Sequence, residues 1–352
     1  MHGEIVKIIG LMSGTSLDGL DIIYVEFDKN DAKAFEIIHS ETSKYSEVWE
    51  SKLREGIHKN SKELTVLDDE YAVLLSEKIL NFITTYGIAE IDFIASHGHT
   101  IIHKPNEGYT LQIGNGELIS KITNQKVICD FRTQDVQLGG QGAPLVPIGD
   151  ALLFSQFDAC LNLGGFANVS YKRNHKRIAF DICPVNIVLN HYVKQVGFEF
   201  DDKGKMASKG EIHQALLNHL NALGFYKKEH PKSLGLEWVQ EQIFPLIDSF
   251  ELSVATILRT FVEHVAIQIA NSLEGRKGVL VTGGGVFNSF LMTRISFLSS
   301  TKISIPSEEI INYKEALIFA LLGLLRVDNQ VNCLSSVTGA NKDHSSGRIF
   351  IP

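Results

Sequence analysis

The sequence predicts an α/β protein with two duplicated domains, because one order of strands and helices occurs twice along the chain. Strand-like runs cover residues 6–12, 21–28 and 34–42, and long helical patterns follow between residues 46 and 87. A second set of strands, in "DACLNL", "FANVSYKR" and "RIAFDI", precedes a helical stretch near residues 185–196. Gly-rich turns join the first two strands of both sets. We therefore expect two related domains with mixed β-sheets flanked by helices.

The domain boundary is predicted from the order of the elements alone. The chain has 352 residues, which is more than one compact core usually occupies, and no Pro/Ser-rich linker divides it. We place domain I at residues 1–130, completed by the C-terminal residues 338–352, and domain II at residues 131–337. The longest apolar block, residues 316–325, is far too short to span a membrane and is predicted to be a buried core helix.

Composition favours a small-molecule partner. The formal net charge is -8 and no long Lys/Arg block occurs, which argues against a nucleic-acid or anionic membrane surface. The four cysteines lack CxxC spacing, so neither a zinc site nor a disulfide framework is indicated, as is typical of the reducing cytosol. We expect no signal peptide and a cytoplasmic protein, because the short N-terminal apolar run leads directly into a Gly-rich turn without a cleavage site.

Three Gly-rich turns at strand ends favour a nucleotide ligand. They lie in "GLMSGTSLDGLD", in "NLGGFAN" and in "VTGGGVFN", where glycines allow a close approach of the backbone to phosphate. Any one of them could equally be an ordinary turn, since Gly, Ser and Asp are common turn residues. The chain contains neither GxxxxGK[ST] nor a dinucleotide-binding GxGxxG, so it is neither a P-loop enzyme nor an obvious dehydrogenase.

Seven motifs together resemble those of the anhydro-N-acetylmuramic acid kinases. They are "GLMSGTSLDGLD", "SHGHTI", "DFRTQDVQLGGQGAPLVP", "NLGGFANVS", "VTGGGVFN", "EALIFALLG" and "SVTGANKDHSSGRIFIP", and they occur in order over nearly the whole chain. The resemblance implies the actin, hexokinase and Hsp70 fold group with ribonuclease H-like domains, the use of ATP and Mg²⁺, and a homodimer. Members of this family cleave the 1,6-anhydro bond of anhydro-N-acetylmuramic acid while phosphorylating O6, which gives N-acetylmuramic acid 6-phosphate for peptidoglycan recycling.

The resemblance assigns the catalytic base to Asp181. Opening the anhydro ring needs a base that activates water for attack at C1, so that O6 can take the γ-phosphoryl group. The family carries this base in FDTGPGN, which matches "FDICPVN" here. Without the family, an Asp after a strand would be interpreted first as a turn former or helix cap. Ile182, Cys183 and Val185 replace the Thr and both glycines, which predicts a stiffer, drier turn and a raised pKa for Asp181.

The expected substrate-binding residues offer charge and hydrogen bonds to a sugar. Arg132 can bind the lactyl carboxylate or balance phosphate charge, while His97, Asp135 and Gln141 offer hydrogen bonds to hydroxyls. A histidine at a strand end is more often a structural group than a ligand. Glu315, at the start of the apolar helix, is a further candidate, although it could simply complement the helix dipole. His99 stands where the family usually has Gln.

The three Gly-rich turns supply the expected nucleotide contacts, and one carboxylate supplies the expected metal contact. In the fold group an acid often begins the first phosphate loop, but Met12 occupies that position here, so Asp18 is the nearest candidate for Mg²⁺. Asp18 could equally be a surface turn residue. The expected nucleotide contacts are Gly14, Thr15, Ser16, Leu17, Asp18, Gly19, Leu20, Asp21, Gly164, Gly165, Gly283, Gly284, Gly285 and Asn288.

Two other functions remain open from the sequence alone. The fold group phosphorylates many sugars, so a kinase for another intact amino sugar is one alternative. The second alternative is a nucleotide-binding regulator without turnover, because the "DICPVN" motif departs from that of the family.

Overall fold

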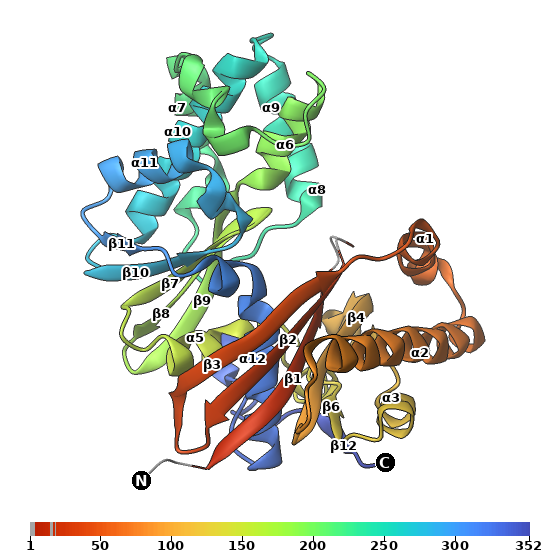
Figure 1. The fold of residues 1–352 in the computed structure, drawn as a ribbon. Coiled ribbons are helices and arrows are strands. Elements are labelled where there is room, and N and C mark those ends of the chain that lie inside the picture. Colours follow the sequence, from red (N-terminus) through yellow and green to blue (C-terminus); the bar gives the residue numbers. More distant parts are fainter. Residues whose placement is uncertain (1–3, 15–16, 18) are drawn as a thin grey trace. The chain divides into compact units, whose positions relative to one another are not determined.

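The computed structural model describes residues 4–14, 17 and 19–352. The chain forms two compact units, each of mixed α/β structure (Figure 1). Unit 1 consists of residues Met1–Leu153 and Tyr313–Pro352, and unit 2 consists of Phe154–Asn312.

The sheet of unit 1 has the strand order β12-β6-β4-β1-β2-β3, and β5 pairs with β4. Neighbours β1, β2 and β3 are antiparallel, whereas β4 is parallel to β1 and β6 is parallel to β4. Each strand forms where β-branched and aromatic residues alternate or run together. The strands are β1 (Ile5–Ser13), β2 (Leu20–Asp28), β3 (Asp31–Ser43), β4 (Phe93–Lys104), β5 (Tyr109–Ile113), β6 (Val127–Cys129) and β12 (Arg348–Phe350).

The helices of unit 1 pack against this sheet through apolar faces. α2 begins at a capping box formed by Asn60 and Glu63 and ends at Gly87, whose φ of 61° suits glycine. Residues 316–325 of α12 are all buried, as predicted for the core helix. The helices are α1 (Glu47–Glu55), α2 (Ser61–Tyr86), α3 (Gly116–Thr123), α4 (Thr133–Gln137), α5 (Val146–Leu153), α12 (Glu308–Val327) and α13 (Ser335–Thr338).

The sheet of unit 2 repeats the topology of the first. Its order is β11-β10-β7-β8-β9, in which β7, β8 and β9 are antiparallel neighbours and β10 lies parallel to β7. Read from β9, this order matches β3-β2-β1-β4-β6 of unit 1, so the predicted duplication of a mixed-sheet domain is confirmed. The strands are β7 (Ala159–Leu163), β8 (Phe166–Arg173), β9 (Lys176–Pro184), β10 (Gly278–Thr282) and β11 (Lys302–Ser304).

Unit 2 also carries a series of short helices that the sequence patterns did not reveal. Between α6 and α10, several single-turn 3₁₀ and π segments accompany α7, α8 and α9. They enlarge the apolar core around α10, where Phe261 and Val262 are completely buried. The helices are α6 (Asn186–Lys194), α7 (Gln214–Ala222), α8 (Leu236–Trp238), α9 (Phe244–Asp248), α10 (Val254–Ser272) and α11 (Ser289–Leu298).

The observed unit boundaries differ from the predicted ones. The division falls after Leu153 and before Tyr313, rather than near residues 130 and 338. The cause is the close packing of α12 on the first sheet. A Cβ added to Gly10 would lie 2.5 Å from the Ala316 carbonyl oxygen, and one added to Gly149 of α5 would lie 2.5 Å from Ile318. Both α5 and most of α12 therefore belong to unit 1.

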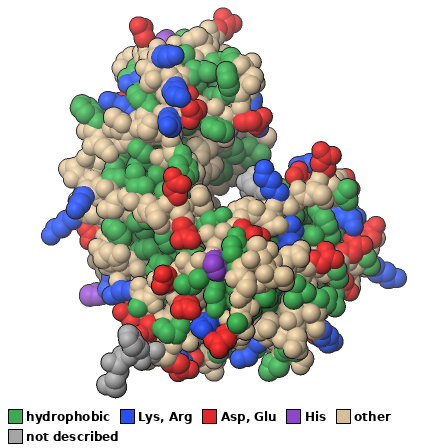
Figure 2. All heavy atoms as spheres, in the orientation of Figure 1, with side chains coloured by type: hydrophobic (Ala, Val, Ile, Leu, Met, Phe, Trp, Pro, Cys, Tyr) green, Lys and Arg blue, Asp and Glu red, His purple; other side chains and the backbone are tan. Residues whose placement is uncertain are grey.

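The surface carries interspersed charges of both signs. On the face shown in Figure 2, Lys and Arg side chains are scattered among Asp and Glu side chains. One example is the ion pair between Lys52 of α1 and Glu70 of α2, whose charged atoms lie 2.6 Å apart. Among the described residues, no helix is both long and apolar enough to cross a membrane.

Candidate functional site

Arg132 joins β4 to the loop that follows β6. Its Nε donates to Nε2 of His97 at 3.0 Å, and its Nη1 donates to the Gly142 carbonyl at 2.7 Å. Burial holds the pKa of His97 well below its usual range, and the Arg132 charge lowers it further. The ring is therefore neutral, with Nδ1 donating to the Gly98 carbonyl at 2.9 Å. Among the described residues, Nη2 of Arg132 makes no hydrogen bond.

Asp135 holds this loop together from inside. Its side chain is completely buried; Oδ2 accepts from the Gly142 N–H at 2.7 Å and Oδ1 accepts from the Thr338 hydroxyl at 2.7 Å. The fit is so tight that a Cβ on Gly140 would collide with the carboxylate. The structure therefore gives Asp135 a positioning role, because neither oxygen is turned to solvent.

Gln141 and Glu315, two other predicted substrate residues, have exposed side chains. The Gln141 backbone N–H donates to the Thr338 carbonyl at 2.8 Å, which fixes the main chain while leaving the amide side chain available. Glu315 follows Lys314, which is buried and pairs with Asp150 at 3.1 Å. Nearby atoms displace part of the water around the Glu315 carboxylate and raise its pKa, although the side chain as a whole stays exposed; the charges of Lys314 and Arg132 oppose this rise.

His99 belongs to a buried network at the end of β1. Its Nδ1 lies 2.8 Å from the Ser13 hydroxyl, which also accepts from Tyr45 at 2.7 Å. The Tyr71 hydroxyl lies 2.6 Å from that of Tyr45. Burial lowers the pKa of His99 to about 4, so the ring is neutral and can accept from Ser13. This network fixes the strand at the point where the first Gly-rich turn begins.

The first Gly-rich turn is described only in part, since Thr15, Ser16 and Asp18 lie outside the described residues. Leu17 has a φ of 62° and donates its N–H to the Gly14 carbonyl at 3.3 Å. A side chain on Gly19 would collide with the Ser43 carbonyl oxygen, 2.9 Å away. Leu20 is buried at the start of β2, and Asp21 accepts from the Thr42 hydroxyl at 2.6 Å. Leu20 and Asp21 therefore have structural contacts of their own.

The third Gly-rich turn combines glycines of two kinds. Gly283 has a φ of 86° and its Cβ would lie 2.7 Å from the Leu163 carbonyl oxygen, while a Cβ on Gly285 would lie 2.7 Å from the Leu163 Cβ. These two glycines allow β10 and β7 to approach each other. Gly284, in contrast, is exposed and has open space where a Cβ would be, so it leaves room for a ligand. Asn288 caps α11 by accepting from the Leu291 N–H at 3.0 Å.

The second Gly-rich turn, between β7 and β8, supports the start of α6. The Gly165 carbonyl accepts from the Val185 N–H at 2.7 Å, and the Gly164 carbonyl accepts from the Asn186 N–H at 3.3 Å. Gly165 is exposed and Gly164 is half-buried. The turn thus presents bare backbone to solvent while its carbonyl groups hold the helix that follows Asp181.

Asp181 lies within β9, next to a β-bulge. Asn168 of β8 pairs with Asp181 and Ala167 pairs with Cys183, so Ile182 is the extra residue. Oδ2 of Asp181 accepts from the Leu234 N–H at 2.8 Å. Burial raises the pKa of this carboxyl group, and the Leu234 hydrogen bond opposes the rise. The half-buried carboxylate has the environment of a general base with a pKa brought nearer to neutral.

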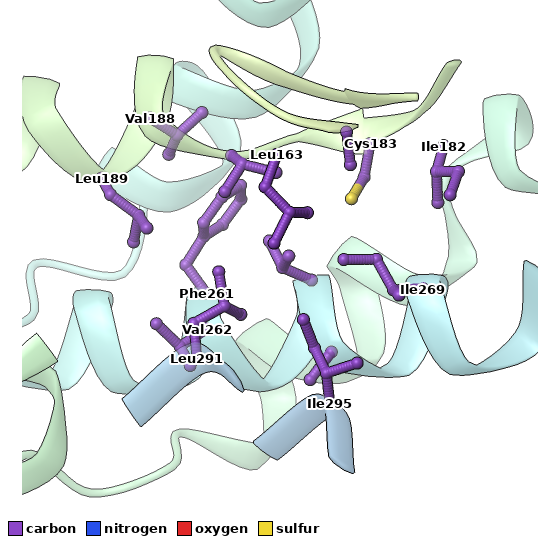
Figure 3. Close-up of a cluster of buried hydrophobic side chains, with 14 of the residues drawn as sticks. Leu163, Ile182, Cys183, Val188, Leu189, Phe261, Val262, Ile269, Leu291 and Ile295 are labelled. Atoms are coloured by element: carbon purple, nitrogen blue, oxygen red, sulfur yellow. The ribbon is translucent and has the colours of Figure 1, made fainter. Parts of the chain in front are cut away.

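The three residues that replace Thr and Gly in the motif are core residues. Ile182, Cys183 and Val185 are buried, and Figure 3 shows Ile182 and Cys183 pointing from β9 towards the apolar side chains around Ile269 of α10. The segment after Asp181 is therefore dry, as the sequence predicted. The strand continues to Pro184, so Asp181 precedes the turn by several residues.

A segment that the sequence patterns did not reveal contacts Asp181. The backbone N–H of Asp181 donates to the Lys232 carbonyl at 3.1 Å, and the Lys232 ammonium lies over the Phe180 and Phe225 rings at 5.7 and 4.8 Å. Burial lowers the pKa of Lys232. The only local signal was the stretch "HPKSLG", whose Pro, Ser and Gly are typical of a functional loop.

Comparisons with known proteins identify relatives along the whole chain. The family described as anhydro-N-acetylmuramic acid kinase matches residues 6–352. A curated protein of that name from Haemophilus influenzae is 35% identical, and the match covers 97% of each chain. The Mannheimia succiniciproducens protein of the same name is 34% identical over 97% of this chain and 98% of its own. The protein of that name from Legionella pneumophila strain Corby is also 34% identical and covers 97% of both.

Proposed function

The chain belongs to the anhydro-N-acetylmuramic acid kinase family, and we propose that it opens the 1,6-anhydro bond of anhydro-N-acetylmuramic acid and phosphorylates O6. The product is N-acetylmuramic acid 6-phosphate, an intermediate of peptidoglycan recycling. We further propose that the protein acts in the cytoplasm as a homodimer. Full-length similarity to several proteins of this name supports the first proposal.

The environment of Asp181 is the observation that carries the proposed chemistry. One carboxylate oxygen is fixed by the Leu234 N–H, and burial raises the pKa of the group. A base of this kind can take a proton from water as the water attacks C1. The C1–O6 bond then breaks, and O6 leaves as the oxygen that receives the phosphoryl group.

The Gly-rich turns support the use of ATP. The described backbone fits a nucleotide at Gly165 and Gly284, which are exposed and carry no side chain. When bound, ATP supplies the γ-phosphoryl group and Mg²⁺ offsets its negative charge. Gly14, with Thr15 and Ser16, is proposed to contact the phosphates. Asp18 is the proposed carboxylate for Mg²⁺, which keeps most of its waters and needs few protein ligands.

Arg132 is proposed to bind the substrate's carboxylate through its Nη2. The two hydrogen bonds to His97 and Gly142 preorient the guanidinium, so less side-chain freedom is lost when the anion binds. Exposed Gln141 and Glu315 are proposed to hydrogen-bond sugar hydroxyls. Asp135 acts through the loop, because its oxygens are used within it.

Turnover of a panel of sugars with ATP and Mg²⁺ tests the proposed function. We expect phosphorylation of the anhydro sugar and not of free N-acetylmuramic acid or other intact amino sugars. In ¹⁸O-water, label should enter the C1 hydroxyl and be absent from the phosphate ester. Phosphorylation of an intact sugar would favour the first alternative, and ATP binding without any phosphosugar would favour a regulator. Label in the phosphate group would contradict water attack at C1.

A further inference from the structure

Three buried side chains of unit 1 meet although one of them, Asp135, is far in the sequence from the other two. Asp135, Cys333 and His344 place one oxygen, one sulfur and one nitrogen within 4.8 Å of one another. The Cys333 Sγ lies 3.3 Å from Asp135 Oδ1, and the His344 Nε2 lies 3.6 Å from the same oxygen. A β-bridge between Cys333 and His344 sets their backbones side by side.

The imidazole of His344 is oriented so that its Nε2 faces the carboxylate. Its Nδ1 lies 3.1 Å from the Lys342 carbonyl oxygen, which can only accept, so Nδ1 carries the hydrogen. In the neutral ring, Nε2 then presents a lone pair. This atom is buried and has no hydrogen-bond partner among the described residues.

Two electron-rich atoms, His344 Nε2 and Asp135 Oδ1, therefore face each other in the protein interior. Asp135 Oδ1 already accepts from the Thr338 hydroxyl, and the Cys333 thiol is within hydrogen-bonding distance of it. A lone pair of His344 opposite this oxygen is unfavourable unless a proton or a metal ion lies between them. Imidazole, thiolate and carboxylate are together the ligand types that Zn²⁺ binds in proteins.

We propose that Asp135, Cys333 and His344 form a binding site for a divalent transition metal ion of the Zn²⁺ type, separate from the Mg²⁺ that accompanies ATP. Ligands at about 2.0–2.3 Å in a tetrahedron are about 3.3–3.8 Å apart, close to the Sγ–Oδ1 and Nε2–Oδ1 distances. The thiol proton is released to solvent as the sulfur binds. Three protein ligands leave a fourth position for water or for the Thr338 hydroxyl.

Bound metal stabilises the loop that carries Arg132. Asp135 Oδ2 accepts from the Gly142 N–H, so the same carboxylate supports the loop while its Oδ1 binds the ion. Cys333 and His344 belong to the C-terminal segment. The ion therefore ties that segment to the loop, and metal binding is coupled to local folding. Cysteine spacing alone gave no sign of this site, because its ligands come from two segments that are far apart in the sequence.

Metal titration of the full-length, tag-free protein tests the proposal. The protein is stripped with a chelator and titrated with Zn²⁺ without nucleotide, in competition with a chromophoric chelator. We expect one tightly bound equivalent per chain. Co²⁺ in its place should give a sulfur-to-cobalt charge-transfer band and the intense visible bands of four-coordination. Zn²⁺ should also raise the melting temperature.

Two conservative variants and one matched control identify the ligands. Cys333→Ser keeps a hydrogen-bond donor, and His344→Asn keeps polarity; each should weaken Zn²⁺ binding by at least about 100-fold, because a direct ligand is lost. Cys129→Ser, a buried cysteine of the same unit, should bind as the wild type does. Wild-type binding no tighter than that of the two variants would overturn the proposal. If both variants fail to fold, X-ray absorption of the Zn²⁺-loaded wild type decides, since a shell without sulfur excludes the site.

Discussion

Oδ2 of Asp181 accepts a hydrogen bond from the Leu234 N–H at 2.8 Å, while Oδ1 has no partner in the described part of the chain. One oxygen is thus held in place and the other is available to a proton. The contact joins β9 to a loop more than fifty residues later, so the loop sets the orientation of the carboxylate. The carboxylate therefore has a defined orientation, while only one of its oxygens accepts a hydrogen bond from the described residues.

Asp181→Asn should lower kcat by about 10²–10⁴-fold, the contribution that a general base typically makes. The amide keeps the shape and can still accept from Leu234, so the dissociation constants for ATP and sugar should change little. Single-turnover phosphosugar formation and calorimetry measure the two effects. Asp248→Asn is the matched control, because exposed Asp248 can still accept from Tyr192 as an amide and should leave turnover unchanged. Normal turnover by Asp181→Asn would remove this residue from the mechanism.

Activity should fall at an acidic pH set by the raised pKa of Asp181. Only the ionised carboxylate can accept a proton from water, and burial shifts its ionisation above the ordinary value of about 3.9. The profile of kcat against pH should therefore show an acidic limb above that value. A profile that stays flat down to pH 4 would show that the rate-limiting step does not involve this ionisation.

The same raised pKa predicts a stability effect of opposite sign to the activity effect. An Asp whose folded-state pKa is above its unfolded value stabilises the fold below the unfolded pKa, and this contribution is lost as pH rises through the folded pKa. At neutral pH, Asp181→Asn removes a buried charge and should melt at a higher temperature than the wild type. At a pH below both pKa values the difference should shrink. Equal melting temperatures at neutral pH would mean that the carboxylate is well solvated.

The sequence predicted what periodic patterns and local motifs determine. The strands from β1 to β3 and from β7 to β9 follow from their β-branched runs. The motif "FDICPVN" predicted the dry segment after Asp181, but this segment continues β9 to Pro184 where a turn was expected. Contacts between segments that are distant in the sequence could not be predicted from these patterns. The loop over Asp181 is one case, and the meeting of Asp135 with Cys333, 198 residues away, is another. The unit boundaries also depended on packing of α12 that no local pattern reveals.

The contrast between Gly283 and Gly284 predicts two different effects of substitution. Gly283→Ala should cost about 1–3 kcal/mol of folding free energy, because its φ of 86° and the nearby Leu163 carbonyl exclude a side chain. Gly284→Val meets open space and should fold, yet weaken ATP binding at least tenfold by filling the ligand's place. Gly224→Val is the control, since Gly224 is exposed, begins a similar 3₁₀ turn and also faces open space. Wild-type ATP affinity in folded Gly284→Val would separate this turn from the nucleotide.

Arg132→Lys should impair both the loop and the sugar site while keeping the charge. Lysine cannot reproduce the fork that serves His97 and Gly142, so one buried acceptor loses its partner, at a cost of about 1–3 kcal/mol. The sugar KM should rise more than kcat falls, because the residue orients the substrate and does not react with it. Thermal unfolding and steady-state kinetics measure the two effects.

Arg326→Lys separates the binding effect from a general loss of stability. Arg326 resembles Arg132 in its contacts, since its Nε donates to the Gly347 carbonyl at 2.7 Å and its Nη1 donates to Asn329 at 2.9 Å. Losing this fork should lower the melting temperature, though by less than at Arg132 because water can satisfy the exposed Asn329, and it should leave the sugar KM unchanged. An equal rise in KM for both variants would show that Arg132 affects the sugar only through the stability of unit 1. A rise confined to Arg132→Lys places its guanidinium at the substrate.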